Sequence, residues 1–182
     1  MTDTMKAEKP RMHLYFGEGK GKTTAAMGLA LRALGHGRRV LVAQFMKTGT
    51  SGELAALRRL PGAMVEVLAP VGGFFSRMSE QERARTIREQ TRQAVSLTNV
   101  ILRERPDMIV LDELALACSR GVVEEAAARA LVEAAMASGE TVVTGREAPS
   151  WLRERADYIS HITAERHPYQ TEGLRAREGV EW

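Results

Sequence analysis

Apolar and polar positions along the chain fall into two alternating patterns. Short apolar runs of strand length occupy residues 12–16, 39–45, 64–68, 107–112, 141–146 and 158–163. Between them, apolar residues recur every three or four positions over 22–35, 53–60, 79–105, 122–138 and 149–155, which is the spacing of amphipathic helices. This alternation of strands with helices predicts an α/β fold in which right-handed crossovers build a three-layer parallel sheet.

Length and composition are those of an ordinary globular protein. The 182 residues suit one domain with a sizeable core, and 44% hydrophobic with 27% charged residues argues against disorder. The net charge of +3 is small and the basic residues are spread out, so we expect no nucleic-acid partner. We expect residues 1–10 to form a mobile N-terminal tail and residues 11–182 to form a single domain.

The cysteine content and the N-terminal segment limit the class further. Cys118 is the single cysteine, which excludes an internal disulfide and every multi-cysteine metal site, and we expect it to be a buried small hydrophobic residue. Residues 1–10 lack the apolar core of a signal peptide, and no run approaches the roughly 20 apolar residues of a membrane span. We therefore expect a cytoplasmic protein without a membrane partner.

The stretch MHLYFGEGKGKTT at 12–24 is the most informative part of the chain, because an apolar strand leads through a glycine-rich turn into a helix. The turn and the start of the helix contain Gly17, Glu18, Gly19, Lys20, Gly21, Lys22, Thr23 and Thr24. Glycines permit positive φ and let backbone N–H groups approach a polyphosphate. Lys22 adds a positive charge, and the hydroxyl of Thr23 can ligate Mg²⁺. The stretch predicts a binding site for nucleotide phosphates.

The register of this loop differs from the usual G-x-x-x-x-G-K-[ST] pattern. That pattern places a glycine at position 16, where this chain has Phe16, so the loop is one residue short if Gly17 opens it. From the residues alone, the alternative is a glycine-rich connection that carries a solvated lysine.

A second informative stretch, DMIVLDE at 107–113, delivers two carboxylates at the end of a buried strand. A Walker-B acid at such a strand end meets the Mg²⁺ held by a phosphate-loop threonine. We therefore expect Asp112 or Glu113 to join Thr23 as a metal ligand. The alternative is a capped strand end with solvated acids.

Further polar residues follow strands at the same carboxyl edge, which is where open α/β sheets bind ligands. Gln44 and Lys47 follow the strand at 39–45. Arg146 ends the strand at 141–146 and can contact phosphate bidentately. Position alone favours a ligand contact and a solvated surface charge equally for Lys47.

Several of these stretches together resemble the ATP:corrinoid adenosyltransferases of the cobalamin pathway, of the single-domain P-loop type with a RecA-like sheet. The matching stretches are GEGKGKTTAAMGLALRALGHG at 17–37, VAQFMK at 42–47, VLDEL at 110–114, VVTGR at 142–146 and the pattern H-x-Y-x-x-E-G-L-x-A-x-x-G-V-E-W from His167. The resemblance extends from Arg11 to Trp182, and the short phosphate loop is typical of this family.

The resemblance implies transfer of the 5′-deoxyadenosyl group of ATP to the cobalt of a reduced corrinoid, with release of triphosphate. Cobalt(I) is strongly nucleophilic and needs no general base, and the sequence has no obvious catalytic triad. In this family the nucleotide lies reversed along the loop, which exposes C5′ to attack. The residues implied in catalysis are Lys22, Thr23, Glu113 and Arg146, aided by Lys20, and those implied in holding Mg²⁺ or Mn²⁺ are Thr23, Asp112 and Glu113.

Two departures from the family concern the corrinoid. Family members carry Gly-Phe-Thr-Trp in the loop that faces the lower side of the corrinoid, where this chain has Gly73-Phe74-Phe75-Ser76. Phe74 matches, and we expect Phe75 to help it in place of tryptophan, although aromatic residues beside glycines more often pack under a loop. Longer members also have an N-terminal extension thought to cover the corrinoid of the partner subunit, and the tail expected here is short.

The resemblance further implies a homodimer and an electron-donating flavoprotein as a partner. From the residues alone, a P-loop ATPase or kinase is a serious rival, because many P-loop ATPases position water with Asp-Glu at a strand end. A nucleotide-dependent corrinoid-binding paralogue without turnover is a third hypothesis.

Overall fold

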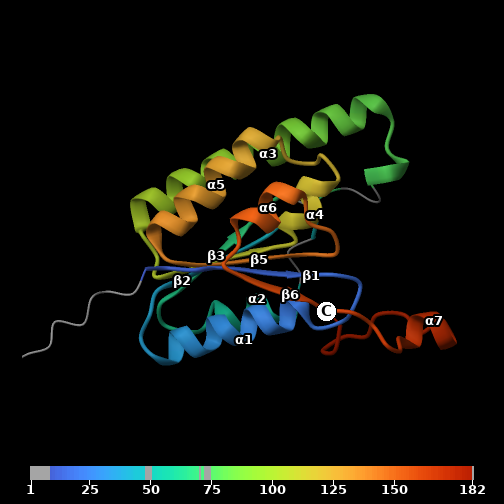
Figure 1. Cartoon of the computed structure of the whole chain (residues 1–182), viewed down its shortest axis with the longest axis horizontal. Coiled ribbons are helices and arrows are strands. Elements are labelled where there is room, and N and C mark those ends of the chain that lie inside the picture. The colour runs from blue at the N-terminus through green and yellow to red at the C-terminus, as the bar shows by residue number, and fades with distance from the viewer. Residues whose placement is uncertain (1–8, 48–50, 70, 72–74, 182) are drawn as a thin grey trace, which may run out of the picture.

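The computed structural model describes residues 9–47, 51–69, 71 and 75–181. They form a six-stranded, fully parallel sheet in the order β3-β2-β4-β5-β1-β6. The strands are β1 (Met12–Phe16), β2 (Val40–Gln44), β3 (Ala63–Val67), β4 (Met108–Asp112), β5 (Glu140–Gly145) and β6 (Tyr158–His161). Helices cover both faces of the sheet (Figure 1). The predicted fold, a three-layer α/β arrangement around a parallel sheet, is confirmed.

The helices divide between the two faces. On one face lie α1 (Lys22–Gly35) and α2 (Gly52–Leu57), and on the other lie α3 (Glu80–Glu104), α4 (Leu114–Ser119), α5 (Glu125–Ser138) and α6 (Ser150–Arg155) (Figure 1). The 3₁₀ turn η1 (Phe75–Arg77) precedes α3. The short helix α7 (Pro168–Glu172) lies beyond the carboxyl ends of the strands (Figure 1).

The strand sequences explain burial on both faces. Every residue of β2 is buried: Leu41 and Ala43 belong to the core shared with α3 and α5, and Val40 and Val42 to the core shared with α1 and α2. Consecutive side chains of a strand point to opposite faces, so a strand covered on both sides is apolar over most of its length, and in β2 the polar Gln44 comes only at the carboxyl end. The continuous apolar runs in the sequence are the consequence.

The strand order sets the geometry of the site. β5 pairs with β1 on one side and with β4 on the other. The phosphate loop after β1 and the acidic pair at the end of β4, Asp112 and Glu113, are therefore separated by one strand at the same sheet edge. The end of β5 lies between them.

The long helices lie where the sequence predicts them, and the differences concern the start of α5 and the short helices α4 and α7. The long helix α3 begins at a capping box, in which Ser79 Oγ accepts a 3.3 Å hydrogen bond from the Glu82 N–H and Glu82 Oε2 accepts a 2.8 Å bond from the Ser79 N–H. The helix expected over 122–138 begins only at Glu125, and α4 forms a separate short helix directly after Glu113.

Cys118 in α4 is half-buried, and burial raises the pKa of its thiol to about 12, which is consistent with a packing role.

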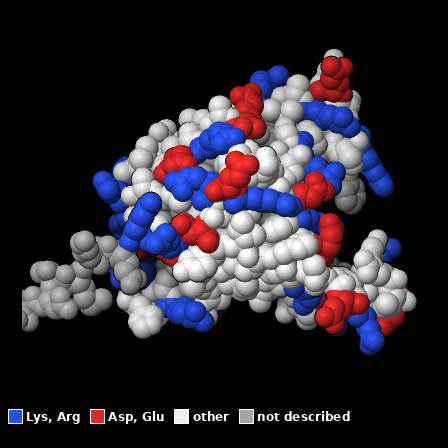
Figure 2. Space-filling view, in the orientation of Figure 1, with Lys and Arg blue, Asp and Glu red and all other residues white. Residues whose placement is uncertain are grey.

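The surface and the termini add three observations. On the face in view in Figure 2, Lys and Arg are interspersed with Asp and Glu, so this face carries no patch of one charge. Within the described ranges, none of the helices combines the length and apolar character that crossing a membrane would require. Residues 1–8 of the expected N-terminal tail lie outside the described residues.

Candidate active site

The phosphate loop joins β1 to α1, and its glycines are required by conformation and by space. Gly17 and Gly21 have φ of 116° and 111°, a region that favours glycine. A Cβ on Gly17 would lie 2.4 Å from the carbonyl oxygen of Ile162, and one on Gly19 would lie 2.6 Å from that of Thr163. The segment after β6 therefore packs directly against the loop backbone.

Two loop amides fasten the loop to its neighbours. The Gly17 N–H donates to the carbonyl oxygens of Gly145 and Arg146 at 3.2 and 3.0 Å, and the Gly19 N–H donates to Ile162 at 2.8 Å. The N–H groups of the first turn of α1 have no intrahelical acceptor, as at the start of any helix. The loop is thus held by β5 and β6 while the start of the helix remains suited to a phosphate.

The unusual residue before the loop, Phe16, has a packing role. Its ring stacks on the imidazole of His161 with centroids 4.6 Å apart, and the guanidinium of Arg153 lies 4.4 Å from its centroid. Phe16 ends β1, His161 ends β6 and Arg153 belongs to α6. The departure from the usual loop pattern therefore puts an aromatic contact where the standard loop has glycine.

Lys22 lies within the loop rather than in solvent. Its side chain is buried, and its ammonium donates a 2.6 Å hydrogen bond to the Gly19 carbonyl. Burial lowers the pKa of Lys22, and the nearby Glu113 carboxylate opposes this shift. The solvated-lysine alternative is thus not supported.

Asp112, which is fully buried, joins the phosphate loop to the end of β5. Its Oδ1 accepts hydrogen bonds from the Thr23 hydroxyl at 2.8 Å and from the Thr144 hydroxyl at 2.7 Å. The contact with Thr23 is the one expected between a Walker-B acid and a phosphate-loop threonine, so the alternative of a solvated strand end fails for Asp112.

The other carboxylate oxygen of Asp112 binds groups from the end of β2. Oδ2 accepts from the Lys47 ammonium at 2.7 Å and from the Gln44 amide at 3.1 Å. The Gln44 amide also donates to Glu53 at 3.0 Å. Both Gln44 and Lys47 therefore lie in the site, and the surface-charge alternative for Lys47 fails.

Glu113 has a positive φ and a carboxylate oxygen that is buried without a hydrogen-bond partner among the described residues. Its φ is 61°, in the left-handed region, and its backbone N–H donates to the Thr144 hydroxyl at 2.9 Å. Its Oε2 is buried without a hydrogen-bond partner among the described residues. Burial raises the pKa of this carboxyl and the Asp112 carboxylate raises it further, while Lys47 and Lys22 oppose the shift.

The donor set fits a magnesium ion. Mg²⁺ prefers oxygen ligands, keeps several waters and is usually held by one or two protein groups together with substrate phosphates. Thr23, Asp112 and Glu113 offer a hydroxyl and two carboxylates, and one carboxylate oxygen is buried without a partner. Among the described residues, no group of three or more His, Cys, Asp or Glu could form an all-protein cage.

Three predicted site residues, Lys20, Thr24 and Arg146, are exposed at or near the phosphate loop. Arg146 is 64% exposed, and its guanidinium lies 3.6 Å from the Glu18 carboxylate. The Lys20 ammonium lies 3.4 Å from the Glu181 carboxylate, which brings the C-terminal segment back to the loop. Thr24 is exposed on α1. Arg146 and Lys20 thus carry positive charge at the open side of the loop.

The predicted corrinoid loop is described in part. Phe74 lies outside the described residues. Phe75 is half-buried in η1, packs against the core under α3 and has the Arg83 guanidinium 5.8 Å from its ring centroid. A hollow of about 630 Å³ is lined by Ala69, Met78 and residues of α3.

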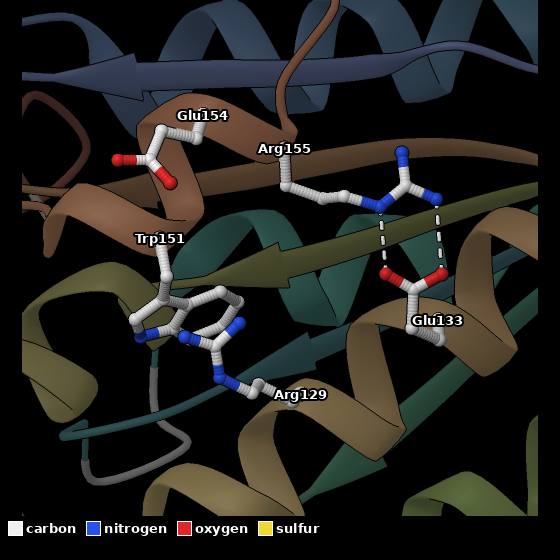
Figure 3. Close-up of a pocket in the computed structure, with 5 residues that line it drawn as sticks. All are labelled: Arg129, Glu133, Trp151, Glu154 and Arg155. Carbon is white, nitrogen blue, oxygen red and sulfur yellow. Dashed lines mark hydrogen bonds and ion pairs between the residues drawn. The ribbon is translucent and has the colours of Figure 1, made fainter.

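A second pocket, of about 340 Å³, lies between α5 and α6 (Figure 3). The guanidinium of Arg155 forms two hydrogen bonds with the Glu133 carboxylate, at 2.6 and 2.9 Å, and that of Arg129 lies 4.5 Å from the Trp151 ring centroid. These side chains pair with one another, and this pocket contains none of the predicted site residues.

Thr144 is the site residue that the sequence analysis missed. Its hydroxyl donates to Asp112 and accepts from the backbone N–H of Glu113, so it orients both acids. It precedes Gly145 and Arg146 at the end of a predicted strand, and that position is the signal that could have identified it.

Comparisons with known proteins agree with the geometry. Residues 8–182 match the family model described as ATP:corrinoid adenosyltransferase BtuR/CobO/CobP. A corrinoid adenosyltransferase of Pseudomonas aeruginosa is 36% identical over 178 residues, which cover 96% of this chain and 85% of that protein. One of Escherichia coli is 31% identical over 175 residues, with 93% and 84% covered. Corrinoid adenosyltransferase CobA of Salmonella typhimurium is 29% identical over 170 residues, again with 93% and 84% covered.

Proposed function

Because this chain belongs to the ATP:corrinoid adenosyltransferase family, we propose that it transfers the 5′-deoxyadenosyl group of ATP to the cobalt(I) of a reduced corrinoid and releases triphosphate. The observation that carries the proposal is the hydrogen bond between Thr23 of the phosphate loop and Asp112, which supports a site where the two residues would hold phosphate and metal together. In the reaction, an electron pair of cobalt(I) forms the bond to C5′. The C5′–O bond breaks, its electron pair leaves with triphosphate, and cobalt becomes formally cobalt(III).

The residues at the loop would stabilise the departing triphosphate. Lys22, buried against the loop backbone, and Lys20 and Arg146, at its mouth, bring three positive charges to one anion. Such preorganised charges are usually the largest contribution to catalysis. A metal ion bound by Thr23 with Asp112 or Glu113 would neutralise further charge on the leaving group, with Mg²⁺ as the expected ion and Mn²⁺ as a substitute.

The remaining parts of the proposal rest on the family. Phe74, aided by Phe75, would close the lower face of the corrinoid. An electron-donating flavoprotein would reduce cobalt(II) to cobalt(I), and the assembly would be a homodimer in the cytoplasm.

The products of the reaction test the proposal. Under anaerobic conditions with Mg-ATP and a chemically reduced corrinoid, we expect an alkylated corrinoid, seen by absorbance, and one equivalent of inorganic triphosphate. A P-loop ATPase or kinase would instead yield ADP, and a corrinoid-binding paralogue without turnover would yield neither. Omission of the corrinoid is the control, because adenosyl transfer then has no acceptor and no triphosphate should form. Formation of ADP in place of triphosphate would contradict the proposal.

A further inference from the structure

Lys47 lies within hydrogen-bond distance of two of the three residues of the proposed metal site, Asp112 and Thr23. Its ammonium is 2.7 Å from Oδ2 of Asp112 and 3.4 Å from the hydroxyl oxygen of Thr23. The Asp112 side chain is fully buried and that of Lys47 is 27% exposed. A buried carboxylate requires a compensating charge, so the ammonium does more than occupy a surface position.

An ammonium and a divalent cation compete at such a place. Both are compact positive charges that bind oxygen, and at short range inside a protein they repel each other. The side chain of Lys47 is long and partly exposed, so it can move away, whereas the Asp112 carboxylate is fixed within the core.

The remaining contacts of Asp112 would hold it in place if Lys47 left. Oδ1 keeps the Thr144 hydroxyl at 2.7 Å, and Oδ2 keeps the Gln44 amide at 3.1 Å. The carboxylate is therefore oriented by neutral donors independently of the lysine, which makes exchange of one cation for another possible without rearrangement of the core.

We propose that Lys47 is an internal counter-cation that competes with the divalent metal for Asp112 and Thr23, and that the triphosphate of ATP gives its ammonium a new partner. The proposal rests on the metal site of the proposed function. Metal alone binds weakly because Lys47 must first be displaced. Metal and nucleotide therefore bind cooperatively, and the coupling is reciprocal, as linkage requires.

Equilibrium dialysis of Mn²⁺ against the nucleotide-free full chain tests this. Lys47→Met keeps the length of the side chain and removes its charge, and we expect it to bind Mn²⁺ about tenfold more tightly than the wild type, within the common range of coupling, about 5–150-fold. Lys47→Arg keeps a charge and should bind as weakly as the wild type. Lys9→Met makes the same change outside the site and is the matched control. Equal affinity of Lys47→Met and the wild type would overturn the proposal.

Thermal unfolding supplies an independent measurement. Without metal, Lys47→Met leaves the buried Asp112 carboxylate uncompensated, so its Tm should fall below that of the wild type, and Mn²⁺ should raise it by more than it raises the wild type. An equal effect of Mn²⁺ on both proteins would contradict the proposal.

A further measurement separates this proposal from the proposed function. If wild-type adenosyl transfer proceeds unchanged in a chelator, the assignment of a metal site is refuted, and the Lys47 proposal is refuted with it. If transfer requires metal but Lys47→Met shows neither effect, the Lys47 proposal alone fails.

Discussion

The hydroxyl of Thr23 donates a 2.8 Å hydrogen bond to Oδ1 of Asp112, although 89 residues separate them in the sequence. Thr23 is in the first turn of α1, which follows β1, and Asp112 ends β4. In the sheet, β5 lies between β1 and β4. The Thr144 hydroxyl of that strand donates to the same oxygen at 2.7 Å. The contact therefore depends on the order of the strands as well as on the two motifs.

Loss of the phosphate-loop side chains should slow adenosyl transfer severely. Lys22→Ala removes a charge on the triphosphate and Thr23→Ala removes a metal ligand, and each should raise the barrier by about 3 kcal/mol, roughly a hundredfold in rate. Steady-state kinetics with Mg-ATP and reduced corrinoid is the measurement. Thr23→Ser retains the hydroxyl and should retain most activity. Near-normal kcat in either alanine variant would refute the phosphate-loop assignment.

Thr144 should act through the two acids that it orients. Thr144→Val keeps the shape of the side chain but removes the donor to Asp112 and the acceptor for the Glu113 N–H, so we expect a loss of stability of about 1–3 kcal/mol and a clear loss of kcat. Thr141 is a matched control, because it is also buried in β5 and donates to the Gly139 carbonyl at 3.1 Å. Thr141→Val should lower stability in urea unfolding and spare kcat. Equal kinetic effects of the two variants would show that Thr144 has only a packing role.

Arg146 should matter for binding and not for folding. It is 64% exposed and its nearest acid, Glu18, is 3.6 Å away, so Arg146→Ala should leave the free energy of unfolding almost unchanged. Arg146→Lys should impair transfer nearly as much as Arg146→Ala, because lysine cannot reproduce a bidentate guanidinium contact. Arg120 pairs with Glu147 at 2.6 Å on the surface, so Arg120→Ala is the control. Unchanged ATP affinity and kcat in Arg146→Ala would make this residue a surface charge.

The Glu113 carboxyl should make the metal-free protein less stable as pH rises. Burial raises its pKa in the folded protein, with a further contribution from Asp112. Below its ordinary pKa of about 4.3 the carboxyl is protonated in both states and has no effect. Between that value and the raised pKa the folded protein holds a proton that the unfolded chain has lost, so stability falls with pH, and above the raised pKa the loss is constant.

Glu113→Gln removes this titration. Urea unfolding of both proteins between pH 4 and pH 8 in a chelator should show that the variant gains stability relative to the wild type as pH rises. Curves that stay parallel over this range would contradict the assignment of a raised pKa to Glu113.

The residues at the carboxyl edge of the sheet could be predicted from the sequence because short continuous motifs contain them. Gly17, Lys22 and Thr23 lie in one continuous motif, and Asp112 follows an apolar run of strand length. Carboxyl ends of parallel strands meet at one edge, so each motif could be placed without knowledge of the strand order.

The contacts between these residues could not be predicted in the same way. The ion pair of Lys47 with Asp112 requires β2 to lie next to β4, and the role of Thr144 requires β5 to lie between β4 and β1. Phe16 interrupts the usual loop pattern because it stacks with His161, which is distant in sequence. The short helix α4 was missed because six residues are too few for a helical periodicity to be distinguished from the preceding buried strand.

Phe74 and Phe75 are the two aromatic residues proposed to face the corrinoid. Cobalt(II) corrinoids are hard to reduce while a lower axial ligand is attached, and removal of that ligand stabilises the orbital that receives the electron. Axial ligation tunes metal potentials widely in other macrocycles, over about 0.8 V in haem proteins. We expect Phe74, aided by Phe75, to fill the lower face and keep water and the nucleotide-loop base away from cobalt.

Phe74→Ala should therefore slow transfer that starts from cobalt(II) with a mild reductant and spare transfer that starts from chemically prepared cobalt(I). ATP binding should not change, because this residue is on a different loop from Gly17–Thr24. Phe75 packs against the core under α3, so Phe75→Ala should also lower the free energy of unfolding, and it serves as the comparison for a packing defect. Equal loss of both reactions in Phe74→Ala would indicate that Phe74 has a packing role instead. The spectrum of four-coordinate cobalt(II) reports the state without a lower ligand, on which the easier reduction depends. Absence of this spectrum in the wild type with Mg-ATP would therefore refute the lower-face hypothesis.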